Sequence, residues 1–146
     1  MPGKISFTVY CRPQPQGSIK AFIPKGWNRP VLTSTNKNLK SFRQETAKAA
    51  IEAVSFFPLS ALPFLKHVPL ELRAVFFFEK PKAAPKSRVY PVVKPDCDKL
   101  ARSIFDALEG IIYEHDAQIV RVVGEKRYGV PERTEVTVSE FKEEVL

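Results

Sequence analysis

The spacing of apolar residues most constrains the fold of this chain. Apolar side chains alternate with other residues through 68–79, which predicts a strand. They recur at steps of three and four through 39–57 and through 97–108, which predicts two amphipathic helices. A capping-type stretch at 34–36 and Pro58 are expected to bound the first helix, and Gly110 is expected to end the second.

Shorter patterns complete the predicted order of elements. Residues 5–11 read as a half-buried strand, and two more strands are predicted over 118–123 and 135–141. Residues 12–37 are rich in Pro, Gly, Ser, Thr and Asn, with short extended pieces such as 18–23, and 79–95 is a long basic loop with four prolines. The order is that of one α/β (α+β) domain spanning 1–146, with a small mixed sheet and two main helices. The 146 residues, 44% of them apolar, suffice for one hydrophobic core.

Charge is distributed unevenly along the chain. The formal net charge is +7, and residues 1–44 contain eight basic side chains and no acidic one. A surplus of this size favours a polyanionic partner such as nucleic acid. Candidate DNA contacts are Lys20, Lys25, Arg29, Lys37, Lys40, Lys82, Lys86 and Arg88. Trp27 could stack on an unpaired base, but a partly buried position is the expectation.

Several classes of protein are disfavoured. No apolar run reaches the roughly 18–20 residues that span a bilayer, and the first residues do not resemble a signal peptide. Cys11 and Cys97 suit neither a disulfide framework nor a zinc site. We therefore expect a cytoplasmic protein with reduced thiols, no membrane partner and no organic cofactor.

The aspartates are concentrated where the acidic residues dominate. All four aspartates of the chain, Asp96, Asp98, Asp106 and Asp116, fall within 21 residues, whereas the twelve glutamates are spread along the chain. Short carboxylates held close together are ligands that Mg²⁺ prefers. For Asp96 and Asp98, capping of the helix start and metal binding are equally supported.

The second predicted helix has a polar face with Asp98, Arg102, Asp106 and Glu109 at steps of four, four and three. This face could form an ion-pair ladder, or it could place Arg102 beside a scissile phosphate. Asp106 lies about 12 Å along the axis from Asp98, which favours a structural or supporting role. After a short connection, the returning chain could bring Asp116 beside Asp96 and Asp98, and three converging aspartates would hold Mg²⁺ for phosphodiester hydrolysis.

The stretch KPDCDKLARSIFDALEGIIYEHDAQIV (94–120) resembles the RusA family of Holliday-junction resolvases, common in phages and prophages. The family pattern is Asp-x-Asp followed by Asn-Leu and a Lys, then Asp-Ala-Leu, then Asp-Asp-Ala-Gln-Val/Ile. Lys99 stands here for the Asn, Arg102 for the Lys, and His115 for the first Asp of the pair. None of these departures removes a residue that the metals need.

The resemblance implies that Asp96, Asp98 and Asp116 are the catalytic, metal-binding carboxylates, with Mg²⁺ as cofactor and Mn²⁺ as a substitute. It implies that Arg102 and Lys99 contact the phosphate. It also implies a homodimer that resolves four-way DNA junctions by paired symmetric nicks. Recombination, repair and phage DNA processing, in a bacterial or phage-infected cytoplasm, all suit this activity.

Three other functions stay open at this point. The chain could be a nuclease of the same fold that prefers flaps or other branched DNA. It could be a non-catalytic junction-binding protein whose aspartates only cap and pair. It could also be a protein-interaction domain with an incidental basic face.

Overall fold

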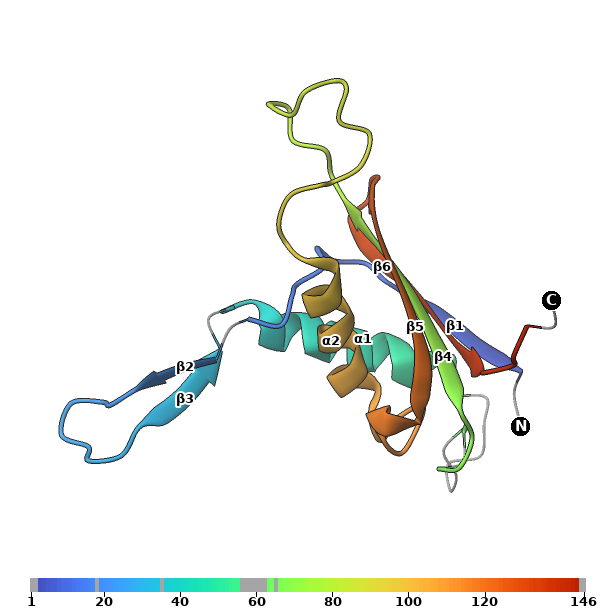
Figure 1. Ribbon diagram of the computed structural model, residues 1–146, viewed down its shortest axis with the longest axis horizontal. Coiled ribbons are helices and arrows are strands. Elements are labelled where there is room, and N and C mark those ends of the chain that lie inside the picture. The colour runs from blue at the N-terminus through green and yellow to red at the C-terminus, as the bar shows by residue number, and fades with distance from the viewer. Residues whose placement is uncertain (1–2, 18, 35, 56–62, 65, 145–146) are drawn as a thin grey trace.

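A computed structural model describes residues 3–17, 19–34, 36–55, 63–64 and 66–144 (Figure 1). Its centre is a four-stranded sheet in the order β1-β6-β4-β5. The strands are β1 (Lys4–Val9), β4 (Leu70–Phe78), β5 (Ile119–Tyr128) and β6 (Arg133–Glu140). β6 pairs antiparallel with β1 and β4, whereas β4 and β5 are parallel. The expected mixed sheet is therefore confirmed.

Two helices, α1 (Leu39–Ala53) and α2 (Cys97–Leu108), cover one face of the sheet (Figure 1). Side chains of β4 alternate between this buried face and the outer face, as the strand period of two requires. Phe42 of α1 and Leu100 and Ile104 of α2 belong to the same core as Leu72 and Phe76 of β4. The helices and the sheet thus share one hydrophobic core, as the sequence predicts.

The ends of two elements differ from the prediction. β5 continues to Tyr128, five residues beyond the expected end of that strand. α1 ends at Ala53, before the expected Phe57. Phe57 and Pro58 lie outside the described residues.

A two-stranded hairpin, β2 (Ile19–Phe22) and β3 (Val31–Ser34), was predicted only in part, through the extended piece at 18–23. The hairpin extends away from the helices and the sheet (Figure 1). Its connecting residues, 23–30, are exposed apart from half-buried Pro24. We call this hairpin and its connection, residues 19–34, the arm.

The predicted long loop and the predicted end of the second helix are both confirmed. Residues 79–95 contain no helix or strand and form a long loop between β4 and α2. α2 ends at Leu108, and Gly110 adopts a φ of +82°, a conformation that L side chains rarely adopt. Within the described part of the chain, none of the helices has the length and apolar composition needed to cross a bilayer.

The turn after α2 is held by a buried tyrosine. Tyr113 is fully buried, and its hydroxyl donates a hydrogen bond of 2.7 Å to the carbonyl oxygen of Phe105. Burial and the nearby carboxylates raise the pKa of Tyr113 well above its ordinary value, so the phenol keeps its proton.

Tyr113→Phe should lower the free energy of unfolding by about 1 kcal/mol, because one buried hydrogen bond is lost. Urea denaturation followed by circular dichroism measures the change. Tyr10→Phe, at a tyrosine that is 73% exposed, is the matched control and should leave the midpoint unchanged. Equal midpoints for the two variants would contradict the role of the Tyr113 hydroxyl.

Candidate active site and nucleic-acid interface

α2 presents its polar face to solvent. Asp98, Arg102, Asp106 and Glu109 are all exposed, whereas Leu100, Ile104 and Leu108 on the opposite face are fully buried. The apolar stripe that predicts the helix therefore also fixes which side chains a substrate can reach.

The first aspartate occupies the capping position of α2 without capping it. Asp96 is the N-cap residue, and its backbone carbonyl accepts the hydrogen bond from the Leu100 N–H, at 3.1 Å. Its carboxylate makes no capping hydrogen bond and lies 3.7 Å from the Lys99 ammonium. The carboxylate of Asp96 is therefore available to a ligand, as the metal-binding interpretation requires.

A basic pocket adjoins Asp96. Its volume is about 440 Å³, and its lining includes Arg12, Lys94 and Lys99. Arg12 is paired with Glu132 at 2.6 Å, whereas Lys94 has no ion-pair partner in the described part of the chain. The pocket thus places cations beside a carboxylate at the N-terminal end of α2.

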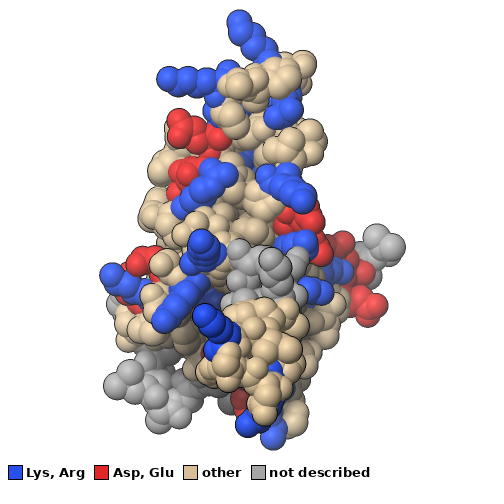
Figure 2. Space-filling model, turned by 90° about the vertical axis from the view of Figure 1, so that its left-hand side faces the viewer, with Lys and Arg blue, Asp and Glu red and all other residues tan. Residues whose placement is uncertain are grey.

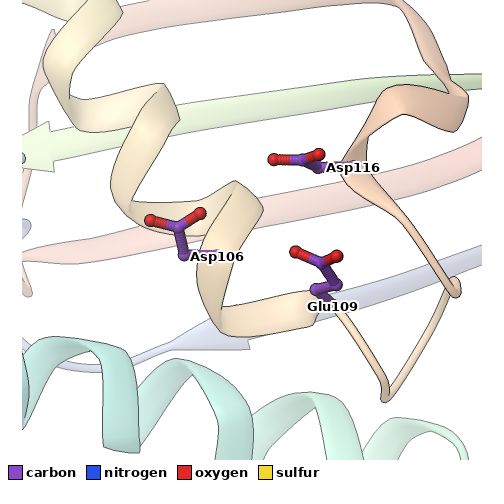
Figure 3. A group of neighbouring side chains, drawn as sticks. All are labelled: Asp106, Glu109 and Asp116. Atoms are coloured by element: carbon purple, nitrogen blue, oxygen red, sulfur yellow. The ribbon is translucent and has the colours of Figure 1, made fainter.

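A group of three carboxylates lies at the other end of α2. Oxygens of Asp106, Glu109 and Asp116 all lie within 4.8 Å of one another, and all three side chains are exposed (Figure 3). Among the described residues, this is the group of three acidic, histidine or cysteine side chains that meets this distance. We call it the acidic group.

Local backbone geometry assembles the acidic group. The N–H of Gly110 donates to the carbonyl of Tyr113 at 2.8 Å, and the N–H of Ile112 donates to Leu108 at 3.1 Å, so the chain reverses directly after α2. A short 3₁₀ helix, η1 (Asp116–Gln118), then leads into β5. The short return places Asp116 beside the last turn of α2.

The acidic group has charged neighbours. Arg43 of α1 donates a hydrogen bond of 2.8 Å to Asp106 and also contacts Gln16. His115 lies 3.5 Å from both Glu109 and Glu114. Arg43 therefore links α1 to the acidic group and partly neutralises it.

The structure brings Asp116 together with Asp106 and Glu109, and it does not bring Asp96 and Asp98 into the same 4.8 Å group. The sequence gives Asp106 a supporting role and Glu109 none. The sequence pattern that could have identified Asp106 and Glu109 as site residues is the polar face of α2, because both follow Asp98 and Arg102 along it. Their proximity to Asp116 depends on the turn at Gly110, which the spacing alone does not specify.

The donor chemistry suits a hard divalent cation. The acidic group offers only carboxylate oxygens, which Mg²⁺ and Mn²⁺ accept. Burial raises the pKa of the Cys97 thiol, so this thiol stays protonated when no metal is bound. The residues present thus fit the expected Mg²⁺.

Arg102 is available for an anion. No ion pair within 4 Å joins it to Asp98 or Asp106 in the described structure, and Asp106 pairs with Arg43 instead. The ladder Asp98–Arg102–Asp106 therefore does not form. An exposed guanidinium one turn from Asp98 is free to contact a phosphate.

The predicted DNA contacts lie on two projecting segments. Lys25 and Arg29 lie in the exposed connection of the arm, and Lys82, Lys86 and Arg88 lie in the loop 79–95. In the described part of the chain, none of these five forms an ion pair with a carboxylate. Figure 2 shows several Lys and Arg side chains on the side of the molecule toward which the arm extends. Lys20 lies in β2, and its side chain lies outside the described residues. Lys37 and Lys40 are exposed at the start of α1.

The expectation that Trp27 is partly buried is wrong. Its side chain is 62% exposed, because the arm connection extends away from the core. Its neighbours Lys25 and Arg29 are exposed as well.

The outer face of the sheet carries several arginines, but neighbouring glutamates neutralise them. Its arginines are paired with glutamates: Arg73 with Glu71, Arg121 with Glu71 and Glu144, Arg127 with Glu125, and Arg133 with Glu135. Cations neutralised in this way attract phosphates less than unpaired ones. The unpaired cations of the arm, the loop and the polar face of α2 therefore make these segments the candidate nucleic-acid interface.

The fold and the site define a small α+β protein with exposed carboxylates beside unpaired cations, a combination suited to enzymes that cut nucleic acid. The chain belongs to the RusA endodeoxyribonuclease family, because the pattern of the family "Endodeoxyribonuclease RusA" matches residues 12–139. It is also similar to "Uncharacterized protein YqaN" of Bacillus subtilis (strain 168). The two are 30% identical over 140 residues, which cover 93% of this chain and 96% of that protein.

Proposed function

We propose that this chain is a Mg²⁺-dependent endonuclease that resolves four-way DNA junctions by paired symmetric nicks. The observation that carries the proposal is the position of Asp116, an exposed carboxylate grouped with two others in a chain of the RusA family. The unpaired cations of the loop and the arm supply the affinity for DNA.

Two sets of carboxylates can hold the metal, and Asp116 belongs to both. One is the acidic group. The other is Asp96 and Asp98 with Asp116; these lie at opposite ends of α2 within one subunit, so this set requires Asp116 from the second subunit of the dimer. When bound, Mg²⁺ supplies a Lewis acid that lowers the pKa of a bound water and stabilises charge on the leaving oxygen. The carboxylates orient the ion, and their exposure leaves room for the phosphodiester.

The cations along α2 bind and orient the substrate strand. Arg102 presents a guanidinium fork that suits two phosphate oxygens. Lys99 and Lys94 border the pocket beside Asp96 and can bind a neighbouring phosphate of the same strand. This arrangement requires no histidine as a general base. His115 therefore has no catalytic role in the proposal and only contacts Glu109 and Glu114.

A homodimer suits the substrate, because a four-way junction with two-fold symmetry is cut at two equivalent positions by a two-fold protein. Each subunit contributes one Asp116 and one α2. The two nicks then fall in strands of like polarity, and a ligase can seal the products.

Cleavage of an end-labelled synthetic four-way junction, with and without Mg²⁺, tests the proposal. The expected result is a pair of symmetric nicks that require metal and are absent from linear duplex. Equal cleavage of flaps and junctions would replace the proposal with a general branched-DNA nuclease. Tight junction binding without cleavage in Mg²⁺ or Mn²⁺ would replace it with a junction-binding protein.

The variant Arg43→Gln shows which of the two carboxylate sets holds the metal ion. Removing this cation should tighten Mn²⁺ binding several-fold if the ion contacts Asp106, because Arg43 competes with the ion for that carboxylate. Mn²⁺ titration followed by electron paramagnetic resonance measures the change without relying on cleavage. Lys48→Gln, which removes an exposed charge elsewhere on α1, is the control. An unchanged affinity in Arg43→Gln would indicate that the ion is held by Asp96, Asp98 and Asp116.

A further inference from the structure

The loop 79–95 exposes apolar side chains as well as cations. Val89, Tyr90, Val92 and Val93 are 69%, 60%, 78% and 46% exposed. Exposed apolar side chains grouped on one short segment mark an interaction site, whereas single ones scattered over a surface need no explanation.

Hydrogen bonds from β5 fix the position of the end of this loop. The ammonium of Lys126 in β5 donates hydrogen bonds to the carbonyl oxygens of Val93 at 2.8 Å and Pro95 at 2.9 Å. Pro91 is buried, and the Val92 N–H donates to the carbonyl of Tyr90 at 2.9 Å across it. Exposed Tyr90 and Val92 therefore flank a buried proline in the sequence, and a backbone hydrogen bond joins them.

The rest of the loop is stiffened in the same way. Its sequence contains four prolines and no glycine. Two turns close through the N–H of Ala84 to Pro81 and the N–H of Arg88 to Pro85, both at 3.0 Å. A preorganised loop loses little conformational entropy when it binds, so its apolar side chains can act as a rigid element.

Charge identifies the class of partner. Glu79 is the single carboxylate between 79 and 95, against five basic residues, and the described structure gives Lys82, Lys86 and Arg88 no carboxylate partner. A second copy of the same loop would be repelled by these cations, whereas a nucleic acid would be attracted. Exposed apolar side chains within a cationic segment are a combination that DNA-binding proteins use to separate stacked bases.

We propose that Tyr90, with Val92 and Val93, inserts between bases at the branch point of the DNA and holds that step unstacked. The inference rests on the proposed junction activity and adds the element that opens the junction. The loop leads directly into Asp96 and Asp98, so a wedge at the branch point brings the adjoining strand to the start of α2.

A four-way junction that carries 2-aminopurine at the branch point tests the insertion in Ca²⁺, which prevents cleavage. Wild-type protein should raise the fluorescence several-fold, since unstacked 2-aminopurine is brighter. Tyr90→Ala with Val92→Ala should abolish that rise and weaken junction binding about tenfold. It should leave the salt dependence of binding unchanged, because no charge is removed.

Tyr90→Phe keeps the ring and should retain the fluorescence rise. Ile51→Ala, which removes an exposed apolar side chain from α1, is the matched control. Circular dichroism verifies that each variant folds, and light scattering gives its oligomeric state. An undiminished rise in the double variant overturns the inference.

A changed oligomeric state in the double variant also overturns it, since the patch is then a contact between subunits. Failure of the proposed function gives a different result: wild-type protein then does not cut the junction in Mg²⁺, or cuts it no faster than flaps or linear duplex. If the wild-type protein prefers and cuts the junction and the double variant does so equally well, the insertion of Tyr90 is excluded while the proposed function stands.

Discussion

Asp116→Asn is expected to abolish cleavage of a four-way junction while the protein keeps its fold and its affinity for the junction. Asp116 belongs to both carboxylate sets, and its side chain is exposed and unpaired in the described structure. The amide has nearly the same shape and loses the charge that holds the ion. The rate should fall at least ~1,000-fold, because metal-ion catalysis contributes several kcal/mol to the barrier.

Single-turnover cleavage measures the rate, and a mobility shift in Ca²⁺ measures junction binding separately. Glu114→Gln, at an exposed carboxylate outside the acidic group, is the matched control and should cut normally. Cleavage by Asp116→Asn at the rate of the control would exclude both carboxylate sets.

Variants at the two ends of α2 then identify the working set. Asp106→Asn should impair cleavage if the acidic group holds the metal, whereas Asp98→Asn should impair it if the ion is held by Asp96, Asp98 and Asp116. In the second case, mixing the Asp98→Asn and Asp116→Asn proteins shows how the set is assembled. One intact site in the mixed dimer, and hence one nick, requires that the aspartates come from different subunits.

Replacing Lys82, Lys86 and Arg88 together with glutamine is expected to weaken junction binding by about two orders of magnitude at ~0.1 M salt. Each lost phosphate contact should reduce the slope of log affinity against log salt concentration by about 0.9. Fluorescence anisotropy across a salt series measures both quantities.

The outer face of the sheet supplies a control that also removes positive charge. Arg73→Gln with Arg127→Gln removes two arginines that pair with Glu71 at 2.9 Å and Glu125 at 2.8 Å. This variant should keep the wild-type slope, because those arginines are already neutralised. A triple loop variant with the wild-type slope would exclude the loop from the phosphate interface.

The sequence predicts the central elements because their patterns are local. The apolar stripe of α2 and the alternation of β4 are strong, and Gly110 marks the end of α2 by a positive φ that glycine adopts readily. The end of β5 is not predicted, because Gly124 and Lys126 interrupt its apolar alternation. Both are explained by tertiary contacts: a Cβ on Gly124 would lie 3.0 Å from the Cys97 sulfur, and Lys126 bonds to the loop.

The candidate site shows the same limit. The polar face of α2, and with it the exposure of Asp98 and Arg102, follows from periodicity alone. The grouping of Asp116 with Asp106 and Glu109 does not, because it joins residues across a turn whose direction depends on buried Tyr113 and its bond to Phe105. Trp27 was misjudged because the arm offers it no core to pack against.

The length of α2 sets a scale on the DNA. Twelve residues at 1.5 Å each give a rod of about 18 Å, with the basic pocket at one end and the acidic group at the other. Successive phosphates of one DNA strand are about 3.4 Å apart along the axis of a duplex. Because a strand also winds round that axis, two of its phosphates held about 18 Å apart by the basic pocket and the acidic group would be only a few nucleotides apart, and the length of α2 would set that spacing.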